Sequence, residues 1–135
     1  MVSALGGVWL TRTVVDPNGG AKQVAVTYTY ARLTHNYSTW WDNAAPECRP
    51  PSTKDQWMAD IRSGFQSLGT TGESTDTKVQ AAGVRSVGGL RKVHVRITPP
   101  ARPTADVEVD VQQVNGTWFV VGYGPPGEAD HCAVF

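Results

Sequence analysis

Residues 21–42 read AKQVAVTYTYARLTHNYSTWWD and lie in the longest part of this chain without glycine or proline. They include three of the four tyrosines and two of the five tryptophans. The large apolar side chains recur at steps of three and four, which places them on one face of an α-helix. That face consists of Val26, Tyr30, Leu33, Tyr37, Trp40 and Trp41. Such a broad aromatic face predicts that later parts of the chain cover it.

The first half of the same segment also alternates like a strand, over residues 23–30. The whole segment is too long for an ordinary strand and suits a long helix. We therefore expect one helix over residues 21–42, and keep the strand as the alternative. The two interpretations differ at Tyr28. In the helix Tyr28 and His35 lie off the buried face, whereas in the strand Tyr28 and Tyr30 share a face.

A second, shorter helix is expected after the proline-rich loop 43–53. Ser52 would cap it, with Asp55 three residues later as in a capping box, and Gly69 would end it. Apolar residues again recur at helical spacing. The expected buried stripe consists of Trp57, Ile61, Phe65 and Leu68.

From residue 77 onward the apolar period changes to two, which indicates β-strands. The expected strands are residues 78–87, 90–97, 105–114 and 117–123. Gly88-Gly89 and Asn115-Gly116 mark tight turns between them. The 135 residues suit one domain, which we place at residues 21–135 after a lead-in segment, 1–20. The predicted class is α+β, with the long N-terminal helix and the second helix packed on a four-stranded antiparallel sheet.

Three short motifs lie in the last two strands: V-x-V-x-V at 107–111, N-G-x-W at 115–118 and V-V-G-Y at 120–123. Together with the order of the helices, they resemble the nuclear-transport-factor-2-like (cystatin-like α+β) superfamily over about residues 20–125. The resemblance implies a curved sheet and a cone-shaped domain. Within that superfamily the chain looks most like extracytoplasmic domains of bacterial conjugation (type IV secretion) components. This likeness implies a non-catalytic protein–protein assembly domain.

The superfamily also contains enzymes, so a second function stays open. It is a small-molecule-binding or isomerase/dehydratase-like protein with a pocket between the long helix and the sheet. Acid–base catalysis needs a carboxylate or an imidazole within reach of the substrate. His35 is the imidazole on the helix and is expected to be half-exposed. The inward strand positions offer no acid or base, so we predict no catalytic residue and no cofactor. They are Val93, Val95, Val107, Val109 and Val111.

The formal net charge is zero, which argues against nucleic acid or an anionic membrane as a partner. The expected partners are other proteins of a membrane-associated complex, or a second copy of the chain. A membrane would be reached only through a segment outside this chain. The candidate binding residues are Tyr37, Trp40 and Trp41. Because Trp40 and Trp41 are adjacent, we expect that one of them is exposed as an interface anchor. The alternative is that both pack under loop 46–51.

Cys48 and Cys132 are the only cysteines and are 84 residues apart in sequence. A disulfide between them would stabilise the fold by about 4.5 kcal/mol in the chain-entropy model. It would also indicate an oxidising, extracytoplasmic compartment. The alternative is two reduced thiols. Glu47-Cys48 and Asp130-His131-Cys132 could in principle assemble a metal site. Structural zinc commonly uses local pairs such as C-x-x-C, which neither half contains, so no metal is predicted.

A basic strand face is formed by Lys92, His94 and Arg96. Antiparallel pairing around the proline-containing turn 99–103 places Lys92 opposite Asp110 and His94 opposite Glu108. Opposite charges across a ladder stabilise it modestly. The expected result is a solvent-exposed face whose charges compensate one another, with an anion or acidic-partner site as the alternative.

Overall fold

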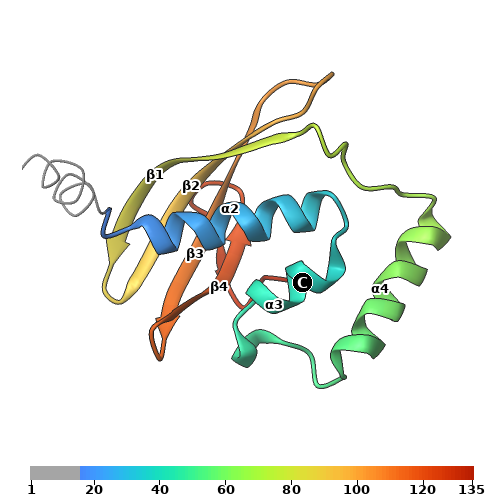
Figure 1. The fold of residues 1–135 in the computed structure, drawn as a ribbon, viewed down its shortest axis with the longest axis horizontal. Helices are drawn as coiled ribbons and strands as arrows, with labels where there is room; N and C mark the ends of the chain where they lie inside the picture. The colour runs from blue at the N-terminus through green and yellow to red at the C-terminus, as the bar shows by residue number, and fades with distance from the viewer. Residues whose placement is uncertain (1–15) are drawn as a thin grey trace, which may run out of the picture.

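The computed structural model describes residues 16–135 and shows helices packed on an antiparallel sheet (Figure 1). The helices in this range are α2 (Gly19–Leu33), α3 (Tyr37–Asn43), α4 (Lys54–Leu68) and the 3-10 helix η1 (Pro46–Cys48). The strands are β1 (Lys78–Val87), β2 (Leu90–Thr98), β3 (Ala105–Val114), β4 (Thr117–Gly124) and β5 (Asp130–His131). Most of the lead-in predicted at residues 1–20 lies outside the described residues. Among the described helices, none has the length and apolarity to cross a membrane.

The segment expected to be one long helix is divided into α2 and α3. His35 stands between the two helices with a left-handed φ of 60°. The Asn36 N–H donates to the Ala31 carbonyl at 2.8 Å, which is the long bond of a Schellman motif. Asn36 then caps α3, because its side chain accepts from the Thr39 N–H at 3.3 Å. The single-helix prediction is therefore wrong at residues 34–36. The helical assignment of 23–30 is confirmed against the strand.

The buried face of α2 also differs from the expected one. It consists of Ala21, Val24, Ala25, Tyr28, Thr29 and Ala31. Tyr28 is 0% exposed, although it was expected off the buried face, whereas Tyr30 and Leu33 are only half-buried. The expected stripe assumes one continuous helix, whereas residues 21–42 form two. The turn between α2 and α3 changes the helical phase, so the face predicted for α2 is rotated away from the one that is buried. The small alanine side chains let α2 approach the sheet closely, and the Tyr28 ring fills the space that remains between α2 and the sheet.

Gly20, near the start of α2, permits close packing of the helix against β4. Gly19 and Gly20 form the first two residues of the helix, with Asn18 at the cap position. A Cβ on Gly20 would lie 2.6 Å from Cδ1 of Trp118, so the indole packs directly on the helix backbone. This contact fixes one end of α2 on β4.

The sheet has the order β1-β2-β3-β4-β5, all antiparallel, with five strands instead of the predicted four. β1 and β3 have the predicted bounds, and β2 and β4 each extend one residue further. β5 was not predicted, because a strand of two residues is too short to show the alternation of apolar and polar side chains. It pairs with Gly122 and Tyr123 of β4. The inner face of the sheet, toward α2, carries fully buried valines at positions 93, 95, 109 and 111.

α4 lies beyond α3 at the side of the molecule and packs on α3 rather than on the sheet (Figure 1). Its cap is Thr53 and not Ser52, since the Thr53 hydroxyl accepts from the Gln56 N–H at 3.1 Å. The prediction that Gly69 ends the helix is confirmed by its left-handed φ of 66°. Of the expected stripe only Trp57 is buried, and Leu68 is 78% exposed. The burial expected for Leu68 is wrong, because the far end of α4 projects away from the core.

Candidate functional site

An aromatic cluster fills the space between α3, α4 and the end of the chain. The Trp57 ring centroid lies 5.3 Å from Trp40, 5.4 Å from Trp41 and 5.0 Å from Phe135. Trp40 is 3% exposed and Trp41 is 8% exposed. The premise that two adjacent tryptophans cannot share a core is therefore wrong. α3 is covered on two sides, so both indoles are enclosed. The guanidinium of Arg49, in the loop after α3, lies 5.4 Å from the Trp41 ring.

The last residues of the sequence, 132–135, enter this cluster as a tail segment. Cys132 is bonded to Cys48, as predicted, with the Cα atoms 4.9 Å apart. Such a bond is consistent with an oxidising compartment. Val134 is fully buried, and its carbonyl accepts from Trp40 Nε1 at 2.7 Å and from the Tyr28 hydroxyl. The disulfide therefore holds the tail segment where it completes the core.

A thiol titration tests this pairing. In denatured protein that has not been reduced, neither Cys48 nor Cys132 should react with a thiol reagent, because both sulfurs are bonded. After reduction the same assay should count two thiols per chain. Two reactive thiols before reduction would contradict the disulfide, and with it the argument for an oxidising compartment.

Tyr28 is linked to a cation inside the fold. Arg32 Nη1 donates to the Tyr28 hydroxyl oxygen at 2.7 Å, and the guanidinium carbon lies 4.3 Å from the Tyr123 ring centroid. Burial, only partly opposed by Arg32, raises the pKa of Tyr28 to about 12. At neutral pH the hydroxyl is therefore protonated and donates to the carbonyl of Val134. This geometry suits a structural hydrogen bond and does not supply a general base.

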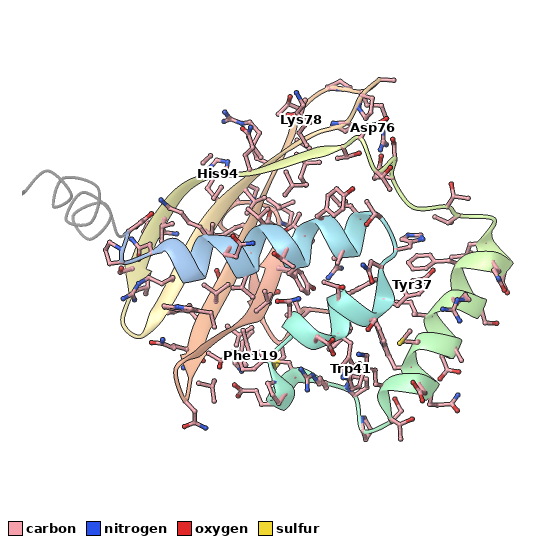
Figure 2. The ribbon with its side chains drawn as sticks, viewed as in Figure 1. Tyr37, Trp41, Asp76, Lys78, His94 and Phe119 are labelled. Atoms are coloured by element: carbon pink, nitrogen blue, oxygen red, sulfur yellow. A yellow bond between two sulfur atoms is a disulfide. The ribbon has the colours of Figure 1, made fainter. Side chains whose placement is uncertain are left out.

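The partly exposed aromatic residues gather where the α2–α3 turn meets α4. The rings of His35 and Phe65 stack at 4.1 Å, and Tyr37 lies nearly parallel to Phe65 at 6.3 Å. All three side chains are half-buried. Figure 2 shows Tyr37 at the start of α3, on the side toward α4. We call this group the aromatic patch. It also includes two residues on the same face of α4 as Phe65. They are Ile61, which is half-buried, and Leu68, which is exposed.

The left-handed turn at His35 builds this patch, because it redirects the chain and brings His35 and Tyr37 onto α4. The segment after α4 packs closely behind that turn. The Glu73 N–H donates to the Leu33 carbonyl at 2.7 Å. A Cβ on Gly72 would lie 2.8 Å from the carbonyl carbon of Thr34, so glycine permits this approach. The turn is thus held from two sides.

A pocket of about 290 Å³ lies next to this turn, between the end of α2 and the β2–β3 connection. Its lining is largely apolar, and Arg102 forms an ion pair with Glu73 beside it. The lining residues are Leu33, Glu73, Ile97, Pro99, Arg102, Pro103 and Ala105. A cavity of this size fits a ligand as large as one amino acid.

The basic strand face has the predicted register, with Lys92 opposite Asp110 and His94 opposite Glu108. It is not a solvent-exposed face along β3, because Glu108 is 8% and Asp110 4% exposed. Lys92 Nζ lies 2.9 Å from Asp110 Oδ2 and 3.6 Å from Glu108 Oε1. β5 and the segment before it cover this end of the face, since the Asp130 carbonyl oxygen lies 2.8 Å from where Gly122 would carry a Cβ, and the Glu128 carbonyl oxygen lies 2.7 Å from where Gly124 would. The expectation of a solvated face is therefore wrong here.

Lys92→Ala should consequently lower the free energy of unfolding by about 3 kcal/mol, more than the loss of a surface ion pair does. The buried Asp110 loses its cation, and among the described residues Glu108 keeps only Arg85, which lies 3.3 Å away. The hydrogen bond that the Lys92 ammonium donates to the Asp110 carboxylate raises the pKa of Lys92 above its usual 10.5. A raised pKa contributes stability that is complete below pH 10.5 and is lost as pH rises through the folded-state value. Urea unfolding at pH 7 and about pH 11 measures both effects. Arg96→Ala, at an exposed pair with Asp106, should change stability by less than about 1 kcal/mol. An equally small loss of stability for Lys92→Ala would contradict the buried ion pairs of Lys92 with Glu108 and Asp110.

Comparison of the chain with protein-family models, with curated proteins and with solved structures finds no match. No relative therefore assigns a role to any of these residues. Of the predicted binding residues, Tyr37 is in the aromatic patch, whereas Trp40 and Trp41 lie beneath it in the core. His35 and Phe65 were not predicted as binding residues. Their stacking depends on the α2–α3 turn, for which the local signal in the sequence is Asn36, a preferred N-cap residue.

Proposed function

We propose that this chain is a non-catalytic assembly domain that acts outside the cytoplasm. It binds other proteins of a membrane-associated complex, or a second copy of itself. The observation that carries the proposal is the aromatic patch of His35, Tyr37, Ile61, Phe65 and Leu68. Aromatic residues and arginine are enriched at protein interfaces, whereas most charged residues are depleted there.

The stacked arrangement favours recognition of a protein surface. His35, Tyr37 and Phe65 are held in place by one another, so they lose little side-chain entropy when a partner binds. The Arg62 guanidinium, 5.4 Å from the Tyr37 ring, adds a polar rim. In this arrangement Tyr37 contacts the partner. Trp40 and Trp41 support the position of α3 from below.

The setting of the domain follows from two further features. The disulfide between Cys48 and Cys132 suits an oxidising compartment. The resemblance to the nuclear-transport-factor-2-like superfamily, with its cone-shaped domain, makes a bacterial conjugation or type IV secretion apparatus the setting that we propose. In that setting the domain acts as a scaffold and needs no cofactor.

A photo-crosslinking amino acid at position 68 tests the assembly function in cells that produce the protein. The same amino acid at Ser63, which is exposed and lies about 140° away from Leu68 around α4, is the matched control. We expect adducts with one defined protein, or with a second copy of the chain, from position 68 and not from 63. Leu68→Glu should reduce partner binding and change stability by less than about 0.5 kcal/mol. Equal adduct patterns at both positions would argue against the patch as an interface.

The pocket beside Glu73 and Arg102 favours a second candidate function, binding of a small molecule between the helix and the sheet. Its ion pair matches both charges of a zwitterion, and its apolar lining matches a hydrocarbon body. Free phenylalanine is the appropriate probe. We expect amide chemical-shift changes confined to the pocket, which disappear in Arg102→Gln and persist in Arg96→Gln. Absence of these changes at millimolar phenylalanine would leave assembly as the supported function.

A further inference from the structure

Three metal-binding side chains converge at the disulfide, and a fourth, Glu47, lies next to one of them. The ligand atoms of Cys48, His131 and Cys132 all lie within 4.8 Å of one another. His131 Nε2 is also 4.0 Å from Glu47 Oε2. The two disulfide sulfurs and one imidazole therefore lie together, with a carboxylate beside the imidazole, although these groups come from two segments far apart in sequence.

The backbone explains how adjacent residues reach the same point. Neighbouring side chains on a regular strand point to opposite faces, which would separate His131 from Cys132. Cys132 adopts a left-handed φ of 60°, uncommon for a residue other than glycine, and this ends the alternation. The turn thus places both side chains on the side of η1, where Glu47 and Cys48 lie.

Hydrogen bonds to β4 hold both segments independently of the disulfide. The Ala45 N–H, just before η1, donates to the Val120 carbonyl at 2.8 Å. The Cys132 N–H donates to the Val121 carbonyl at 2.6 Å. Because neighbouring carbonyls of one strand anchor the two segments, the four donors stay close together when the sulfur–sulfur bond is broken.

We propose that, when the disulfide is reduced, Glu47, Cys48, His131 and Cys132 bind one Zn²⁺ ion. Cysteine, histidine and carboxylate are the ligands of tetrahedral zinc sites. With Zn–S bonds of about 2.3 Å, the sulfurs would stand about 3.8 Å apart, so each moves by roughly 1 Å from its place in the disulfide. Side-chain rotation is sufficient for this shift.

The electron and proton balance of the change is simple. A dithiol reductant transfers two electrons to the Cys48–Cys132 bond and becomes a disulfide itself, which leaves two thiols on the chain. Each thiol releases one proton when its sulfur binds Zn²⁺. Either the disulfide or the metal then closes the same loop, of 84 residues in sequence separation. The tail segment is thereby held against the aromatic cluster in both redox states.

Metal titration of the reduced full chain tests the site. Reduction uses a phosphine, which takes its oxygen from water and, unlike a thiol, does not compete for zinc. Co²⁺ serves as the spectroscopic probe, since thiolate ligation produces a sulfur-to-cobalt charge-transfer band. We expect one Co²⁺ per reduced chain, displaced by one Zn²⁺, and no such band with the oxidised chain.

Matched variants separate this site from incidental binding. Loss of an outer-shell partner typically weakens metal binding by about 10- to 100-fold. His131→Ala removes a direct ligand and should weaken Zn²⁺ binding by more than this. Glu47→Gln should weaken it by at least about 10-fold. His94→Ala, which removes a histidine on the outer face of the sheet, should leave affinity unchanged. Equal binding by His131→Ala and the wild type, or by the oxidised and reduced chains, would overturn the proposal.

Folding gives a readout that does not depend on spectroscopy of the metal. Zn²⁺ should raise the melting temperature of the reduced chain, and should restore its circular dichroism if reduction unfolds it. Cys132→Ser also lacks the disulfide but has one thiolate fewer, so zinc should stabilise it much less. Identical stabilisation of both chains would count against the four-residue site.

Discussion

Tyr28→Ala should lower the free energy of unfolding by about 3–5 kcal/mol, as truncation of a large buried side chain does. The ring is fully buried under the sheet-facing side of α2, 5.6 Å from the Tyr123 ring. Its loss would also remove the hydroxyl that donates to Val134 and accepts from Arg32. Because small domains are stable by only about 5–15 kcal/mol, this variant should be close to unfolding. Thermal melts and urea titrations provide the measurement.

Tyr30→Ala is the matched control for that variant. Tyr30 is half-buried, and its hydroxyl donates to the Thr75 carbonyl at 2.7 Å in an exposed position. Its truncation should cost clearly less than that of Tyr28. Tyr28→Phe separates the ring from the hydroxyl and should cost about 1 kcal/mol, since the Val134 carbonyl keeps the bond from Trp40. Equal losses for the two alanine variants would show that the buried face of α2 has been assigned incorrectly.

Reduction of the Cys48–Cys132 bond should lower the free energy of unfolding by about 4.5 kcal/mol, given its sequence separation of 84. The physical reason is the greater conformational freedom of the unfolded chain once the cross-link is gone. The experiment needs a chelator, so that no metal replaces the bond. Tryptophan fluorescence should shift to longer wavelength if the tail segment leaves the indoles, because Phe135 packs on Trp40, Trp41 and Trp57.

The double variant Cys48→Ala, Cys132→Ala provides the control for that experiment. It removes the cross-link without a reductant and should lose a similar free energy of unfolding. Cys48 and Cys132 are both half-buried, so little of the loss would come from packing. If the free energies of unfolding of the reduced chain and of the double variant were both within about 1 kcal/mol of that of the oxidised protein, the disulfide would not be a main source of stability.

Local sequence was sufficient for the four long strands and their pairing. Alternating valines and glycine-containing turns are properties of neighbouring residues, so they predicted β1 to β4 and the register that places Lys92 opposite Asp110. The end of α4 at Gly69 is equally local, because glycine readily adopts the left-handed conformation. The cysteine pairing was also predicted, since two cysteines in a loop and a tail allow only one intramolecular disulfide.

The tertiary structure decided the features on which the candidate sites depend. The turn at His35 changes the phase between α2 and α3, so no single helical period could identify Tyr28 as buried. The aromatic patch requires that turn, and Tyr37 was its only member predicted to bind. Glu108 and Asp110 are buried by a returning segment that leaves no local pattern. The convergence of Glu47 with His131 likewise depends on both segments docking on β4. Apart from the turn at His35, these features are contacts between residues distant in sequence, and such contacts depend on chain packing rather than on the order of neighbouring residues.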